Sequence, residues 1–426
     1  MTPSKIKEYI QKGLLDERLT YIYGKNSVEL QRDRYLKAID SFISLYGEQE
    51  NSNLYSVSGR SELSGNHTDH NCGCVIAASV SLDIIAVAAA SSDSRILLKS
   101  EGFDADEVDI QKYTSPDKSK FGSSASIIAG MCAEMNARGY HTGGFCAYTT
   151  SNVPGGSGLS SSAAFEDMIG NIENHMYNNG SIDNVEIAKI AQIAENKFFG
   201  KPCGLMDQVA CAAGGAVAID FKNPTSPIIE KIEFDLDSIG YNLCIINTGG
   251  NHADLTDDYA SIPSEMKAIA SYFGKNVLRE INKEDVISGI SALREKLGDR
   301  AILRALHFFD ENRRVQIQKN SLLKKDYQTF FENVNLSGKS SFCYLQNVYT
   351  SKNTSEQGIS LALNLAERFL DNKGAYRVHG GGFAGTIQAY VPTDMTFDFA
   401  KYMDACFGKG ACMILRIRPV GAIKVL

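Results

Sequence analysis

Helical spacing of apolar residues recurs in several parts of the chain. In residues 35–46 the apolar side chains fall three or four positions apart, which predicts an amphipathic helix. The same spacing predicts a helix over 184–199, where Asp183 and Glu186 have the arrangement of a capping box. Residues 283–332 are also helical in pattern and strongly charged.

Segments with strand character lie among these helices. They are rich in β-branched residues or alternate between apolar and polar positions, which is typical of strands. Because helices and strands are mixed throughout, the pattern predicts an α/β or α+β protein. The segments are residues 54–57, 75–80, 84–89 and 385–391.

The length of the chain predicts more than one domain. A chain of 426 residues exceeds what one hydrophobic core usually serves, so we expect two domains. Its 43% hydrophobic and 22% charged residues are typical of a globular protein. The polar stretch 221–237, which contains Pro224 and Pro227, is the predicted seam. We therefore divide the chain into 1–230 and 231–426.

Charge and hydropathy limit which partners the protein can bind and in which compartment we expect it. The formal net charge is −7 and no basic stripe is visible, which argues against nucleic acid as a partner. Lys5, Lys7 and Lys12 interrupt the N-terminal segment, so it does not resemble a signal peptide, and we expect a cytoplasmic protein. Residues 72–90 are weakly polar but contain Asp83, so they predict two buried strands and not a membrane span.

Ten cysteines are scattered along the chain without any CxxC pair. This spacing predicts neither a zinc site nor a disulfide framework. We expect reduced thiols that behave as small apolar residues.

Residues 154–164 form a Gly-rich turn that leads directly into a helix-forming stretch. Glycines allow backbone N–H groups to approach an anion, and a helix N-terminus favours phosphate oxygens. The alternative is a plain Gly/Ser linker, but a linker has no reason to continue into a helix. No lysine follows as in a P-loop, so a different kinase architecture is indicated.

Four segments in the expected order resemble the galactokinase branch of the GHMP kinase superfamily. One is the Gly-rich turn, and weaker similarity over 248–259, 304–315 and 336–346 fills the gaps. The matching residues are Gly59, Arg60, Gly65, Asn66, His67, Thr68, Asp69, His70, Asn71 and Gly73; Ala194, Glu195, Phe198, Gly200, Cys203, Gly204, Met206, Asp207 and Gln208; and His379, Gly380, Gly381, Gly382, Phe383, Ala384 and Gly385.

The resemblance implies a two-domain α+β GHMP kinase fold. Its N-terminal domain would be like the second domain of ribosomal protein S5, and its C-terminal domain would be ferredoxin-like. ATP and a sugar would bind in the cleft between them. The activity implied is phosphorylation of the C1 hydroxyl of a sugar, foremost galactose, by a monomeric enzyme that needs magnesium.

The resemblance also implies a role for two charged residues. Asp207 matches the catalytic aspartate, which would accept or orient the proton of the C1 hydroxyl. Its alternative role is to cap a turn after Gly204. Arg60 matches the arginine that faces this aspartate and would stabilise the transferring phosphoryl group. A surface ion pair is the alternative for Arg60.

The family's nucleotide and metal positions fall on the Gly-rich turn and the helix of Glu195. Magnesium prefers oxygen ligands, and Ser162, with Ser161 as its neighbour, would hold it together with Glu195. A solvated salt bridge is the alternative for Glu195. The implied nucleotide-binding residues are Gly155, Gly156, Ser157, Gly158, Leu159, Ser160, Ser161, Ser162 and Ala163.

Polar side chains are expected to hold the sugar, because unpaired buried polar groups penalise the wrong epimer. His67 read alone would be a structural histidine, but beside Asp69 in a Gly-bounded loop the sugar-binding interpretation is favoured. The implied substrate-binding residues are Arg60, Asn66, His67, Asp69, Gly204, Asp207 and Tyr259.

The first motif departs from the galactokinase pattern. Glu62 stands where the family has asparagine, and His70 stands where it has tyrosine. Asn66 replaces a glutamate near the sugar C6 hydroxyl, and an amide donates as well as accepts hydrogen bonds. We therefore hypothesise that the site tolerates a hexuronic acid such as galacturonate.

Two alternatives to a galactose kinase stay open. One is another anomeric sugar kinase, acting on galacturonate, arabinose or N-acetylgalactosamine. The other is a galactokinase-like sensor that binds ATP and sugar without turnover. Such sensors are damaged in the serine stretch, whereas residues 160–164 are complete here and Asp207 and Arg60 are present.

Overall fold

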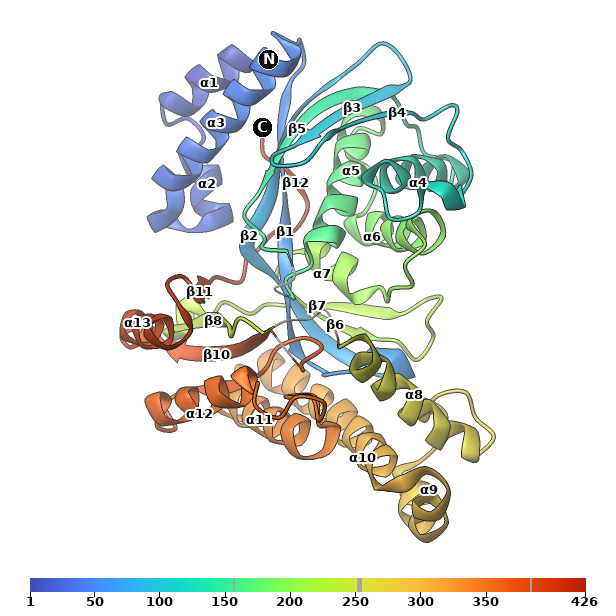
Figure 1. The fold of residues 1–426 in the computed structure, drawn as a ribbon. Helices are drawn as coiled ribbons and strands as arrows, with labels where there is room; N and C mark the ends of the chain where they lie inside the picture. Colours follow the sequence, from blue (N-terminus) through green and yellow to red (C-terminus); the bar gives the residue numbers. More distant parts are fainter. Residues whose placement is uncertain (156–157, 251–254, 384) are drawn as a thin grey trace.

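Two β-sheets organise the chain (Figure 1). The computed structural model describes residues 1–155, 158–250, 255–383 and 385–426. The mixed α+β class expected from the sequence is confirmed.

The first sheet has eight strands and contains most of the N-terminal half. They run in the order β12-β1-β2-β5-β3-β4, and β6 pairs with both β2 and β7. Every pairing is antiparallel except that of β3 with β5. The strands are β1 (Asn53–Ser64), β2 (Cys74–Ala90), β3 (Arg95–Ser100), β4 (Ala105–Asp109), β5 (Phe145–Ser151), β6 (Ala216–Asp220), β7 (Ile228–Ile232) and β12 (Ile423–Lys424).

Helices cover both faces of this sheet (Figure 1). Successive side chains of a strand point to opposite faces. Tyr55 and Ala86 accordingly pack with α4 to α7, and Leu54 and Ile85 pack with α1 to α3. The helices are α1 (Pro3–Gln11), α2 (Asp16–Tyr23) and α3 (Val28–Tyr46) on one face, and α4 (Ser124–Ala137), α5 (Ser161–Tyr177), α6 (Asn184–Ala194) and α7 (Met206–Ala213) on the other.

The second sheet has four antiparallel strands in the order β11-β8-β10-β9. One cluster of buried residues contains Ile76 of β2, Ile245 of β8 and Phe330 of α11, so the two sheets share a core. The elements are β8 (Tyr241–Asn247), β9 (Ala375–Val378), β10 (Thr386–Pro392) and β11 (Cys412–Leu415), with α8 (Thr256–Tyr272), α9 (Lys283–Ser288), α10 (Ile290–Leu323), α11 (Tyr327–Ser340), α12 (Gly358–Leu370) and α13 (Thr396–Phe407).

The expectation of two strands within 72–90 is wrong. The single strand β2 runs from Cys74 to Ala90, because no glycine or proline interrupts it. Its two halves change partners, since 74–78 pair with β6 and 84–90 pair with β5. Asp83 lies inside the strand and is fully buried.

The helix expected over 184–199 changes character before its end. Asp183 caps α6 by accepting a hydrogen bond from the backbone of Val185, and Glu186 forms an ion pair with Arg138. After Ala194 the chain continues as a π-turn over Glu195–Phe199. Such turns are frequent at functional sites.

The domain boundary at residue 230 stays a prediction. The position falls inside β7, which pairs with β6 in the first sheet. The last strand, β12, also returns to the first sheet and pairs with β1.

Two findings concern membranes and thiols. In the part of the chain that the structure describes, no helix is long and apolar enough to cross a bilayer. All ten cysteines are free thiols.

Asp83 of β2 joins α2, α3, β1 and the C-terminal segment. Its carboxylate forms ion pairs with Arg34 of α3 and with Arg418 near the C-terminus, the latter at 3.0 Å. The hydroxyl of Tyr23 donates to it at 2.5 Å, and Ser56 of β1 donates as well. Burial raises the pKa of Asp83, but the two arginines outweigh it, so the pKa lies below its ordinary value.

Asp83→Asn is expected to lower the free energy of unfolding by about 3–5 kcal/mol, because Arg418 keeps an uncompensated buried charge. Urea unfolding measures this. The control Asp40→Asn removes the exposed Lys7–Asp40 pair and should cost less than about 1 kcal/mol. Equal losses in the two variants would contradict the role of Asp83.

Candidate active site

Arg60 lies in β1, at a point where the pairing of β1 with β2 is irregular. The pairing of β1 with β2 shifts register between Ser58 and Arg60 and again between Glu62 and Ser64. Irregularities of this kind redirect side chains at the edge of functional sites. The Arg60 side chain is only 9% exposed and extends toward α7 and the Gly-rich turn.

The Gly-rich turn lies directly against β1. The backbone N–H of Arg60 donates to the carbonyl of Leu159 at 3.0 Å, and its guanidinium donates to the carbonyl of Gly158. A Cβ on Gly59 would lie 2.9 Å from the Leu159 oxygen, which explains why glycine stands there. Gly156 and Ser157 lie outside the described residues.

Asp207 lies in the first turn of α7, and its carboxylate accepts three hydrogen bonds. Arg60 donates to Oδ1 from Nε at 2.8 Å and from Nη2 at 2.6 Å. The hydroxyl of Ser160 donates to Oδ2 at 2.5 Å. About a third of the side chain is exposed, at 35%, so solvent reaches this carboxylate.

Electrostatics keep this carboxylate ionised. Burial by itself raises the pKa of Asp207, but the charge of Arg60 and the hydrogen bonds from Ser160 and Arg60 lower it below its ordinary value. Burial likewise lowers the pKa of Arg60, and Asp207 outweighs it and raises the pKa. The pair therefore stays charged at neutral pH.

A second carboxylate lies at the π-turn after α6. Glu195 is almost fully buried and pairs with Lys201 at 3.0 Å. The amide nitrogen of Gln208 donates to Glu195 at 2.9 Å and to Glu166 of α5 at 3.0 Å.

The side-chain oxygens around Glu195 are of the kind that bind a divalent cation. Among the described residues, Glu166 Oε1 and Gln208 Oε1 are buried without a hydrogen-bond partner. Ser161 and Ser162 form the first turn of α5, and Ser162 is exposed. Hydroxyl and carboxylate oxygens are the donors that Mg²⁺ prefers, and substrate phosphates and waters usually complete its shell.

Three of the predicted sugar-binding side chains contact consecutive carbonyls of the C-terminal Gly-rich segment 379–385, called the third Gly-rich segment below. Asn66 Nδ2 donates to Gly380 at 2.7 Å, and the hydroxyl of Tyr259 donates to Gly382 at 2.7 Å. His67 Nε2 lies 2.9 Å from the carbonyl of Gly381. The segment is thus held by both halves of the chain. Ala384 lies outside the described residues.

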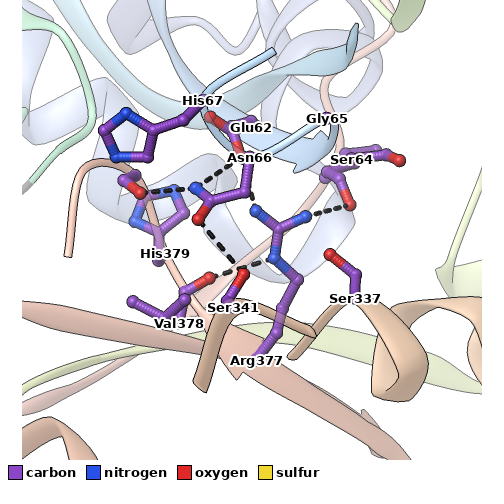
Figure 2. Close-up of polar contacts among 12 residues, drawn as sticks. Glu62, Ser64, Gly65, Asn66, His67, Ser337, Ser341, Arg377, Val378 and His379 are labelled. Atoms are coloured by element: carbon purple, nitrogen blue, oxygen red, sulfur yellow. Dashed lines mark hydrogen bonds and ion pairs between the residues drawn. The ribbon is translucent and has the colours of Figure 1, made fainter. Parts of the chain in front are cut away.

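Asn66 lies between Glu62 and Ser341 (Figure 2) and makes the full set of hydrogen bonds that an amide allows. Its nitrogen donates to Glu62 as well as to Gly380, and its oxygen accepts from Ser341 at 3.2 Å and from Asn347 at 2.8 Å. The side chain has no exposed surface. Direct contact of Asn66 with a sugar, and the hexuronate hypothesis built on it, would require exchange of these partners.

The remaining predicted sugar residues lie together. A Cβ on Gly204 would lie 3.5 Å from the carboxylate of Asp69, and Gly204 is exposed. His70 lies beside Asp69 at 3.8 Å. This side of the loop is more open than the side of Asn66.

Residues 65–73, between β1 and β2, contain the predicted sugar-binding residues of the first motif and are called the sugar loop below. Two residues of α10 hold this loop and were not singled out from the sequence. Glu311 accepts from the backbone N–H groups of Gly65 and Asn66, both at 3.3 Å. His307 Nε2 lies 3.0 Å from the carbonyl of Asn66. Burial raises the pKa of Glu311, but Arg314 and other charges lower it to about 2. The weaker similarity over 304–315 was the signal for this segment.

Family comparisons agree with this geometry. A family model described as the GHMP kinases N terminal domain matches residues 126–215. A second, described as the galactokinase galactose-binding signature, matches residues 40–90. The matched ranges contain the Gly-rich turn, Asp207 and the loop of Asn66.

Curated relatives match most of the chain. The galactokinase of Glaesserella parasuis is 31% identical over 347 residues, which is 79% of this chain and 84% of that protein. The galactokinase of Clostridium acetobutylicum is 30% identical over 366 residues, which is 83% of this chain and 88% of that protein.

Solved structures share the fold. The galactokinase of Lactococcus lactis, crystallised with galactose, superposes with a TM-score of 0.73 at 24% identity over 90% of this chain and 98% of that chain. The mevalonate kinase of Methanococcus jannaschii superposes with a TM-score of 0.60 at 14% identity over 86% of this chain and 99% of that chain.

The fold and the matched segments define a kinase of the GHMP superfamily. Within that superfamily, the chain belongs to the galactokinase family. It is an enzyme, a sugar kinase, and the family implies ATP as its phosphoryl donor.

His379 supports the site as a neutral imidazole. Its ring contacts Ser61 of β1 at 3.1 Å and Thr386 of β10 at 3.0 Å. A Cβ on Gly158 would lie 3.4 Å from its Nδ1, so the ring borders the Gly-rich turn. Burial lowers the pKa of His379 to about 3 and that of His67 to about 4.

His379→Gln is expected to make stability less dependent on pH. Below about pH 6.5 the unfolded chain protonates this histidine and the folded chain does not until about pH 3, so wild-type stability falls with acidification. Between pH 6 and 4 the variant's slope should be shallower by about 1.4 kcal/mol per pH unit. Urea unfolding at pH 6, 5 and 4 measures it, and an unchanged slope would count against a neutral buried His379.

Proposed function

We propose that the enzyme transfers the γ-phosphoryl group of ATP to the C1 hydroxyl of galactose. The observation that carries the proposal is the Arg60–Asp207 ion pair beside the amino end of α5. The relatives named galactokinase support galactose as the substrate. Magnesium as the metal, a monomeric state and a cytoplasmic location are part of the same proposal.

In this proposal Asp207 accepts or orients the proton of the C1 hydroxyl. A carboxylate that is ionised and partly exposed is suited to that role. Arg60 is already held by this carboxylate and by Gly158, so its charge is aligned before substrate binds. It stabilises the negative charge that spreads over the phosphoryl oxygens.

The nucleotide phosphates bind at residues 155–163, where the first-turn N–H groups of α5 and the positive end of its dipole favour anions. Ser162 and Glu195 hold the magnesium ion, with Ser161 as neighbour. The ion neutralises charge on the phosphates when it is bound. Lys201, through an ion pair, and Gln208, through a hydrogen bond, orient the Glu195 carboxylate.

Asp69, His67, Tyr259 and the backbone at Gly204 form the sugar site in this proposal, together with Asn66. Side chains that pair with every hydroxyl discriminate strongly, because the wrong epimer leaves buried polar groups unpaired.

A coupled ADP-release assay over hexoses and hexuronic acids tests the proposed function. We expect turnover of galactose, with a sugar 1-phosphate detected by phosphorus NMR. Turnover of galacturonate in preference to galactose would show that the proposed substrate is wrong and would leave the proposed phosphoryl transfer unchanged. Binding of ATP and sugar without ADP release would instead identify a sensor.

Asp207→Asn is expected to lower kcat by ~10² to 10⁴, because the amide cannot accept the proton. Steady-state kinetics with saturating ATP and sugar measure it. Asp220→Asn is a matched control, since Asp220 pairs with Arg279 at 2.9 Å and is similarly exposed at 28%. The control should retain wild-type kcat. Activity of Asp207→Asn within about threefold of wild type would remove the role of a base.

Glu195→Gln is expected to weaken metal binding by roughly tenfold or more, since even outer-shell partners of a metal contribute 10- to 100-fold. The affinity for Mn²⁺ in the presence of an unreactive ATP analogue, followed by electron paramagnetic resonance, measures binding without turnover. Glu230→Gln, at a surface pair with Lys319, serves as the control. Equal Mn²⁺ affinity in the two variants would exclude Glu195 as a ligand.

A further inference from the structure

A buried ion pair joins the two sheets directly behind the sugar loop (Figure 2). Glu62 lies on β1 in the first sheet, and Arg377 lies on β9 in the second. The Arg377 side chain has no exposed surface and that of Glu62 is 7% exposed. The pair lies outside the residues assigned to catalysis or binding above.

Arg377 is fixed by all three nitrogens of its guanidinium. Nε donates to the carbonyl of Val378 at 3.0 Å, Nη1 to the carbonyl of Leu63 at 3.3 Å, and Nη2 to the carboxylate of Glu62. A planar fork with three separate acceptors has little freedom to rotate. Arg377 therefore holds Glu62 in one position.

Glu62 in turn holds the sugar loop through a hydrogen bond from Asn66. Its Oε1 accepts from Asn66 Nδ2 at 3.2 Å, and the same nitrogen donates to Gly380. The next residue on each side, His67 and Gly381, are themselves in contact at 2.9 Å. The pair thus fixes the position where the sugar loop meets the third Gly-rich segment.

Stability alone does not explain a pair in this place. Replacing a buried ion pair by apolar residues of similar volume is often neutral or stabilising, because desolvation offsets the attraction. Here the pair aligns polar groups of a binding loop. The pair also gives a reason why this chain departs from the family pattern, with glutamate in place of asparagine at 62 and asparagine in place of glutamate at 66. A carboxylate at position 62 pairs with Arg377, and an amide at position 66 can donate a hydrogen bond to Gly380.

We propose that Arg377 and Glu62 are positioning residues for sugar binding, which act through Asn66 on His67 and the segment 380–381. The inference rests on the proposed sugar kinase function. Sugar affinity depends on this pair, whereas the chemical step and nucleotide binding, which use Asp207 and the Gly-rich turn, do not.

Two conservative variants test the proposal. Arg377→Lys keeps the charge but cannot reach three separate acceptors. Glu62→Gln keeps the shape, but it removes the negative charge from Oε1, the oxygen that accepts from both Asn66 and Arg377. Each should raise the KM for galactose roughly 10-fold or more, the worth of a lost hydrogen bond to a charged group. The KM for ATP should stay within about twofold and kcat within about threefold of wild type.

Arg418→Lys is the matched control, because Arg418 is equally buried and pairs with the buried Asp83. It should lower the melting temperature as Arg377→Lys does and leave the KM for galactose unchanged. A purely structural pair would reduce the active fraction, and hence kcat, without a selective change in the KM for sugar.

The outcomes separate the two proposals. Wild-type protein without turnover of any sugar overturns the proposed function and the positioning role together. Wild-type turnover, with both variants folded and the KM for galactose within about twofold of wild type, overturns the positioning role alone. A rise in the KM for galactose in Arg418→Lys as large as in Arg377→Lys overturns it as well.

Discussion

The geometry of the site depends on the ion pair between Arg60 and Asp207. One guanidinium ties β1 to the first turn of α7 and to the carbonyl of Gly158 in the Gly-rich turn. Ser160 closes the arrangement from the start of α5. Because a buried charge without its partner is costly, the three segments that would surround a phosphoryl group are held together before substrate arrives.

The third Gly-rich segment is where the two halves of the chain meet. Consecutive carbonyls of 380–382 accept hydrogen bonds from the loop after β1 and from α8, and the ring of His379 borders Gly158. A shift of the sugar loop would therefore displace His379, which borders the Gly-rich turn, and the residues after it. If sugar and phosphates bind as proposed, this proximity would help to align the acceptor hydroxyl with the phosphates.

Local motifs made part of this arrangement predictable from the sequence. Glycines followed by a helix-forming stretch indicated a turn that leads into α5, and the segments of Arg60 and Asp207 matched the family by residue. The single strand β2 was missed because Asp83 looked like an interruption, and its partners Arg34 and Arg418 lie far away in the chain. Distance in sequence likewise hid Arg377, His307 and Glu311. The fold class followed from periodicity, whereas the inward orientation of Asn66 required three-dimensional contacts.

A crystal structure with galactose and an unreactive ATP analogue tests the central claim most directly. We predict that the C1 hydroxyl lies about 2.6–3.2 Å from the Asp207 carboxylate, with the nucleotide phosphates at the amino end of α5. Sugar or nucleotide bound in separate pockets, with Asp207 in contact with neither, would contradict the account.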